Sequence, residues 1–237
     1  MNIATGMSVI ALSVAAVFLS IQVAAVRRAA DAHRPGPLFL PLVSAATVGW
    51  LALWYFVASR GALADVDARP PPLFLIFPAT LGMGVALGFS SIGTRVVQST
   101  PVGILVMVQG FRLPLEVVMH EAALQKTMPM QMSWSGFNFD VVTGAAALLV
   151  GALALLGKAP RALVWAWVVL SFITLVTVVG IGAASTPVFH AFGTAPEQLN
   201  TWLADPPYVW LPVVMVAFAL AGQFWVVRRL NFEGVPA

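Results

Sequence analysis

Three ionisable side chains recur at four-residue intervals in one apolar stretch of the chain. Arg112, Glu116 and His120 lie within residues 101–124, a run that is otherwise largely apolar. In an α-helix, this i, i+4, i+8 spacing places all three side chains on one face. A guanidinium group can hold an anion, while a carboxyl group and an imidazole can exchange protons. The pattern favours a polar site for a small ligand, with Glu116 or His120 as the proton-exchanging group.

Two further polar residues, Asn138 and Asp140, directly precede the next apolar run. Both residue types accept hydrogen bonds from free amide groups at a helix N-terminus, and a carboxylate there also meets the positive end of the helix dipole. Helix capping is one explanation for them. The short connection after residue 124 would also bring them beside Arg112, so they join the candidate substrate-binding set. That set is Arg112, Glu116, His120, Asn138 and Asp140.

Arg112 falls near the middle of its apolar run. A charged side chain at the centre of a bilayer costs at least ~2.5–3.5 kcal/mol, so this face is expected to point into a helix bundle or a water-filled cavity. One explanation is a structural ion pair between Arg112 and Glu116 within a single helix. The other is a functional pocket open to the outer side. Pro114 leaves the carbonyl of Gly110 without its helical donor and predicts a distorted helix, which favours a cavity.

The sequence carries no strong pattern for a metal or a cofactor. It contains no cysteine and no HExxH, GxSxG, Walker or GxGxxG motif. Alternating Met128, Met130 and Met132 are the type of ligand that holds Cu(I), and His190 lies in a loop with carboxylates that suit zinc. No second cluster supports either site. We therefore predict no resident metal and no cofactor.

The elements that must position these residues are transmembrane helices. About 20 apolar residues are needed to cross the hydrocarbon core, and the chain offers seven such runs in a single domain of residues 1–237. The predicted spans lie near residues 4–26, 38–59, 72–92, 101–124, 139–157, 162–185 and 207–227. The predicted fold class is an all-α membrane bundle of seven helices. The small-residue pairs Gly84/Gly88 and Ala147/Gly151 predict close helix contacts.

The basic residues predict how the chain is threaded through the membrane. With the N-terminus outside and the C-terminus in the cytoplasm, eight basic residues fall on the inner side and three on the outer side. The inner ones are Arg27, Arg28, Arg34, Arg95, Lys158, Arg161, Arg228 and Arg229, and the outer ones are Arg60, Arg69 and Lys126. Because cytoplasmic loops are enriched in Lys and Arg, this is the orientation that we predict.

Composition excludes a soluble domain. Hydrophobic residues make up 60% of the chain and charged residues 9%, whereas soluble domains carry ~25% charged residues. The mean hydropathy of +0.93 agrees. The net charge is +3, but the basic residues separate apolar runs and form no basic stripe with aromatics, so nucleic acid is not an expected partner. The expected partners are the lipid bilayer and a small-molecule ligand, and no pattern indicates an oligomeric state.

Three segments resemble a family of small bacterial inner-membrane proteins without assigned activity. They are residues 111–116, which contain the RxPxE motif, residues 136–144, which contain NFDxxTG, and residues 207–212. The Asn-Phe-Asp part is the most specific. The resemblance implies a multi-pass protein of the bacterial inner membrane and implies no activity. The family tends to carry a histidine in its last helix where this chain has Gln223.

Three functions stay open on the sequence. The first is binding or translocation of a small anionic or zwitterionic solute in an outward-facing pocket, with proton coupling. The second is an intramembrane enzyme that uses Glu116 or His120 as general base. The third is a non-catalytic membrane subunit or sensor whose charge cluster is purely structural.

Overall fold

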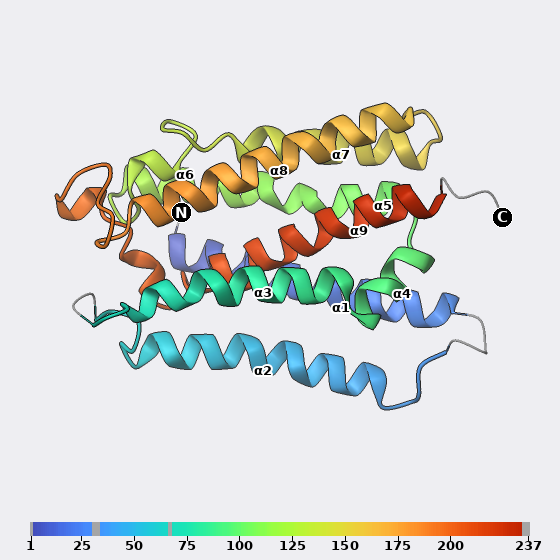
Figure 1. Cartoon of the computed structure of the whole chain (residues 1–237), viewed down its shortest axis with the longest axis horizontal. Helices are drawn as coiled ribbons and strands as arrows, with labels where there is room; N and C mark the ends of the chain where they lie inside the picture. The colour runs from blue at the N-terminus through green and yellow to red at the C-terminus, as the bar shows by residue number, and fades with distance from the viewer. Residues whose placement is uncertain (1, 30–33, 66–67, 234–237) are drawn as a thin grey trace.

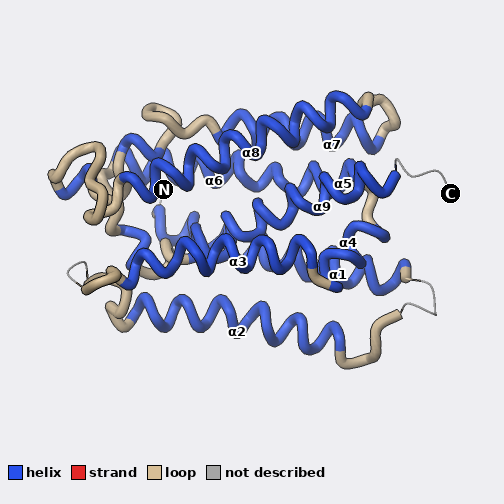
Figure 2. The backbone as a smooth tube through the Cα atoms, viewed as in Figure 1, coloured by secondary structure: helices blue, strands red, loops and turns tan. Residues whose placement is uncertain are grey.

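The structure is a computed structural model that describes residues 2–29, 34–65 and 68–233, and this part of the chain contains helices and no strand (Figures 1 and 2). The all-α fold class is therefore confirmed. The helices are α1 (Ile3–Arg28), α2 (Phe39–Ser59), α3 (Ile76–Phe89), α4 (Ser91–Ser99), α5 (Val102–Met107), α6 (Arg112–Leu124), α7 (Asp140–Leu155), α8 (Arg161–Ala184) and α9 (Ala217–Glu233).

Shorter turns connect or extend several of these helices. A 3-10 turn at Pro72–Leu75 leads into α3, and a second at Val108–Phe111 lies between α5 and α6. A π-helical segment at Leu211–Val216 runs directly into α9. The extended last helix ends at Glu233, a few residues beyond the predicted limit of 227.

Within the described residues, six helical stretches are long and apolar enough to cross a bilayer. They are Ile3–Arg28, Phe39–Ser59, Pro72–Phe89, Val102–Leu124, Arg161–Ala184 and Leu211–Phe232. The chain is therefore a multi-pass membrane protein. The predicted span 139–157 corresponds to α7, which has 16 residues. At ~1.5 Å per residue α7 covers ~24 Å, less than the ~30 Å hydrocarbon core, so the seventh crossing stays a prediction.

The long helices lie side by side, and their connections gather at two opposite ends of the bundle (Figure 1). α1 begins at the end that holds the connection between α6 and α7, and α9 finishes at the other end. The helix ends that carry most of the predicted inner basic residues meet at this second end, namely the end of α1, the turn between α7 and α8, and the end of α9. Helices α2 and α6, which directly precede Arg60 and Lys126, finish at the first end, and the orientation of the bundle in the membrane stays a prediction.

Small residues mark the closest helix contacts. A Cβ atom added to Gly84 or Gly88 would lie 2.8 Å from a side-chain carbon of α9, so α3 packs tightly there. Gly103 and Gly151 face each other between α5 and α7, and a Cβ atom on either would lie 2.8 Å from the carbonyl oxygen of the other. Ala147 is also fully buried. Both predicted pairs therefore lie at helix interfaces.

The predicted helix over residues 101–124 is interrupted at its middle. Pro114 has no amide hydrogen for the carbonyl of Gly110, and the 3-10 turn at Val108–Phe111 lies at this point. Arg112 is the first residue after the turn, at the start of α6. The distortion predicted from Pro114 therefore coincides with the position of the buried charge.

Candidate functional site

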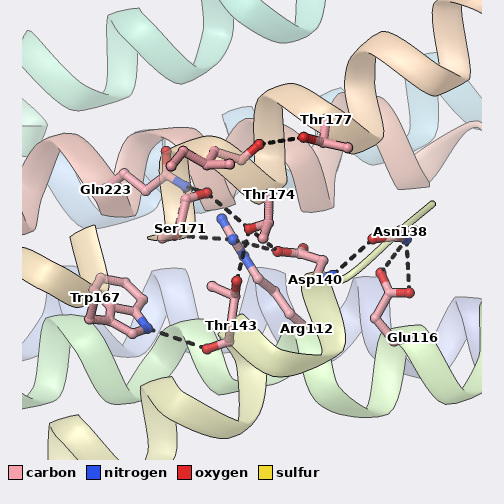
Figure 3. Close-up of polar contacts among 11 residues, drawn as sticks. Arg112, Glu116, Asn138, Asp140, Thr143, Trp167, Ser171, Thr174, Thr177 and Gln223 are labelled. Atoms are coloured by element: carbon pink, nitrogen blue, oxygen red, sulfur yellow. Dashed lines mark hydrogen bonds and ion pairs between the residues drawn. The ribbon is translucent and has the colours of Figure 1, made fainter. Parts of the chain in front are cut away.

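Arg112 is buried, with 1% of its surface exposed, and forms an ion pair with Asp140 (Figure 3). Its Nη1 donates to Oδ1 of Asp140 at 2.9 Å and to Oγ of Ser171 at 3.1 Å. The same carboxyl oxygen accepts a hydrogen bond from Oγ1 of Thr174 at 2.8 Å. The pair therefore ties α6 to α7 and α8, and Arg112 does not form the intrahelical pair with Glu116 considered from the sequence.

Glu116 is buried one turn further along α6 and is held by Asn138. The Nδ2 of Asn138 lies 2.9 and 2.8 Å from the two carboxyl oxygens of Glu116, and 3.0 Å from the carbonyl oxygen of Met132. The Oδ1 of Asn138 accepts from the amide of Asp140 at 3.0 Å and so satisfies a free N–H at the start of α7. Asn138 thus binds both the first amide of α7 and the carboxyl group of Glu116, while its role in ligand binding stays a prediction.

Hydroxyl and amide groups from three helices complete the network. The hydroxyls of Thr143 and Thr174 lie 2.8 Å apart, and Nε2 of Gln223 donates to Oγ of Ser171 at 2.7 Å. All four residues are buried, and Figure 3 shows them around Arg112 and Asp140. Sequence reasoning did not select Ser171 and Thr174, because hydroxyls in apolar helices commonly bond to their own backbone. Their i, i+3 spacing on α8 was the signal that would have found them.

His120 takes no part in the hydrogen bonds that join the other four candidate residues, and its Nδ1 has no partner among the described residues. Its ring stacks on Trp134, with centroids 4.3 Å apart and planes 21° apart, and it forms no hydrogen bond to those four, all of which lie in the described part of the chain. A role for His120 in ligand binding therefore stays a prediction. Among the residues that the structure describes, no three His, Asp or Glu side chains gather as a metal site would require.

The three methionines considered as Cu(I) ligands lie in different surroundings. Met128 and Met132 are buried, whereas 40% of the surface of Met130 is exposed. Met132 lines the cavity beside the charged network. His190 is exposed, and its Nδ1 lies 3.4 Å from the carbonyl oxygen of Pro187.

A small cavity borders the charged groups. It has a volume of about 50 Å³, enough for water, and Arg112, Glu116 and Asp140 line it together with Thr80 of α3. Its other walls are apolar side chains, mainly of α3, α6, α8 and the π-helical segment. Within the described structure, Nε and Nη2 of Arg112 and Oγ1 of Thr80 are buried without a hydrogen-bond partner. Since buried polar groups are normally paired, water or a ligand is the expected partner.

Comparisons of the chain with models of protein families, with curated proteins and with solved structures find no match. The resemblance to a bacterial inner-membrane family therefore stays a prediction. The buried network that joins Arg112 and Asp140 is an observation on this chain itself.

Proposed function

We propose that the protein binds or translocates a small anionic or zwitterionic solute at the cavity beside Arg112, with Glu116 as the proton-exchanging group. The observation that supports this is the buried guanidinium group. Its Nη1 donates to Asp140 and Ser171, whereas Nε and Nη2 have no acceptor among the described residues. The same guanidinium group borders the cavity. A carboxylate or phosphate oxygen is the acceptor that such donors prefer.

The balance of charge limits what can enter. Arg112 and Asp140 neutralise each other. Glu116 is a second carboxyl group, and among the described residues its only side-chain hydrogen-bond partner is the neutral amide of Asn138. An anion beside an ionised Glu116 would place two like charges in a medium of low dielectric, which is unfavourable. The solute should therefore arrive with a proton on Glu116, or as a zwitterion whose cationic end faces Glu116. The apolar walls fit a solute with a small apolar body.

A purely structural cluster is the second candidate. It is favoured by the bonding of Asp140, whose Oδ1 is already shared by Arg112 and Thr174, so that three helices are joined without any ligand. The two candidates differ in one measurable property. A binding site must admit a small charged solute to Arg112, whereas a structural cluster need not.

The absence of cysteine from the chain makes this difference testable by thiol labelling. Thr80 lines the cavity, so Thr80→Cys places the only thiol there. We expect it to react with a small anionic methanethiosulfonate reagent in the purified protein. Replacing Arg112 and Asp140 together by Leu should slow the reaction with the anionic reagent by about tenfold, because one hydrogen bond to a charged group is lost. The rate of reaction with a cationic methanethiosulfonate reagent should not change.

Thr100→Cys is the matched control, because Thr100 is equally buried but does not line this cavity. It should not react with either reagent. A Thr80→Cys protein that is as unreactive as the control would favour the structural cluster. Equal reaction with both reagents, unchanged by the loss of Arg112, would show water access without an anion site.

A further inference from the structure

Helix α2 is fastened to the bundle near its middle and stands away from it toward its N-terminus (Figure 1). Nε1 of Trp50 donates to the carbonyl of Val213 at 2.9 Å, and Nε1 of Trp210 donates to the carbonyl of Leu51 at 3.0 Å. Few other side chains of α2 are buried, and Leu42 is 64% exposed. The N-terminal half of α2 thus forms one wall of a gap rather than a packed interface.

This gap is an apolar crevice of about 460 Å³, within the usual ~300–1,000 Å³ of ligand sites. α1, α3, α4 and the last helix form the other walls, and the side chains facing it include Val14, Phe18, Val43, Leu87 and Phe218. Because the walls are mostly apolar and lie among membrane-spanning helices, the occupant that they suit is a hydrocarbon chain.

One end of the crevice carries a cation with a free donor. Arg95 lies on α4, and its guanidinium group is 4.3 Å from the centre of the Phe39 ring at the start of α2. Its Nη1 is buried without a hydrogen-bond partner among the described residues. Arg28 at the same end of the bundle differs, because its Nη1 donates to the carbonyl of Ser99 at 3.1 Å. Arg95 is therefore placed to donate a hydrogen bond to an anion at this end of the crevice.

We propose that this crevice binds an anionic phospholipid, with its phosphate group on Arg95 and an acyl chain between α2 and the bundle. From Phe39 to Trp50 the crevice follows 11 residues of α2, or ~16 Å at ~1.5 Å per residue. That is about half of the ~30 Å hydrocarbon core, the depth of one leaflet. The polar end lies at the end of the bundle and the apolar part inside it, as in the bilayer itself.

The site is tested with the purified full chain in nanodiscs of phosphatidylcholine alone or with added phosphatidylglycerol. Phosphatidylglycerol should raise the midpoint of thermal unfolding of the wild type, and native mass spectrometry should detect one bound copy. Arg95→Gln should weaken this binding by about tenfold, as expected for a charged hydrogen bond. Ala46→Phe, which fills the crevice wall without touching Arg95, should also abolish it.

Two variants serve as matched controls. Arg27→Gln removes the same charge from an exposed position near that end, and Ala45→Phe adds the same ring one residue away from the crevice wall. Both should bind phosphatidylglycerol as the wild type does. If Arg27→Gln lost as much phosphatidylglycerol binding as Arg95→Gln, the effect would be one of general surface charge. If inorganic phosphate alone raised the unfolding midpoint equally, the site would bind an anion and not a lipid. If Arg95→Gln does not fold, the test rests on the comparison of Ala46→Phe with Ala45→Phe. Equal binding of phosphatidylglycerol by these two variants would overturn the proposal.

Discussion

At the scale of single residues, the central feature is a guanidinium group whose partner comes from another helix. Asp140 approaches Arg112 from α7, 28 positions away in the sequence, and Thr174 of α8 shares the same carboxyl oxygen. Removing one partner of a buried pair costs roughly 3–5 kcal/mol, whereas replacing both by apolar groups can be nearly neutral. Each partner is therefore needed to neutralise the other, although the pair as a whole adds little net stability.

This predicts a strong coupling between Arg112 and Asp140. Arg112→Leu and Asp140→Leu should each lose ~3–5 kcal/mol of unfolding free energy, and the double variant should lose far less than the sum. Unfolding of the purified variants in detergent measures all three values. The same three measurements for Arg112→Leu, Glu116→Leu and their double variant serve as the comparison. A larger coupling free energy in that set would mean that Glu116, and not Asp140, is the partner of Arg112.

A second prediction concerns the contact between Glu116 and Asn138. Asn138→Leu leaves two carboxyl oxygens and the Met132 carbonyl without their donor, so it should destabilise the fold by ~1–3 kcal/mol or more. Glu116→Gln keeps one oxygen acceptor and should cost less, while it removes the carboxyl group that we propose to exchange the proton. Detergent unfolding would contradict this picture if Glu116→Gln were the more damaging change.

The sequence was sufficient to select four of the residues that meet in the site, because the i, i+4 spacing and the short connection constrain where their helices lie. It did not distinguish between Asp140 and Glu116 as the partner of Arg112. That choice depends on the rotation of α7 against α6, which no local pattern encodes. The contributions of Ser171 and Thr174 were missed for the same reason, because they depend on how α8 packs.

At the scale of secondary structure, hydropathy was a sound guide to the long helices and a poor guide to α4. The nine residues of α4 include Ser91, Thr94, Arg95, Gln98 and Ser99, too polar and too short to be detected as a span. The oxygen of Ser90 accepts from the amide of Gly93 at 3.3 Å and starts this helix directly after α3. The link expected between the third and fourth spans is therefore a helix that carries Arg95.

The contact between α5 and α7 gives a prediction at this scale. A Cβ atom on Gly151 would lie 2.8 Å from backbone atoms of Gly103 and Met107, which cannot move aside as a flexible side chain can. Gly151→Ala should therefore cost ~1–3 kcal/mol of unfolding free energy through overpacking. Gly82→Ala is the control, since nothing lies within 4 Å of its added Cβ, and it should be neutral or stabilising. Equal effects in detergent unfolding would contradict the proposed close contact.

At the scale of the whole molecule, three arginines at one end of the bundle, Arg28, Arg161 and Arg229, are bound to carbonyl groups near helix ends, unlike Nη1 of Arg95. Arg28 donates to the carbonyl of Ser99 at the end of α4, and Arg229 donates to that of Val97 at 3.0 Å. Arg161 donates to the carbonyl of Leu230 at 2.8 Å. Cations suit the carbonyl end of a helix, where the dipole is negative. The residues that predict topology thus also fasten the helices at that end.

The last prediction tests both the orientation and the crossing by α7. Because the chain has no cysteine, Gln125→Cys before α7 and Lys158→Cys after it each provide a single exposed thiol. With the N-terminus outside and α7 crossing, a membrane-impermeant maleimide added to intact cells should label Gln125→Cys, and should label Lys158→Cys only after the membrane is opened. The reverse pattern would invert the orientation. Labelling of both thiols in intact cells would mean that α7 does not cross, and its 16 residues would then be a helix folded back within the bundle.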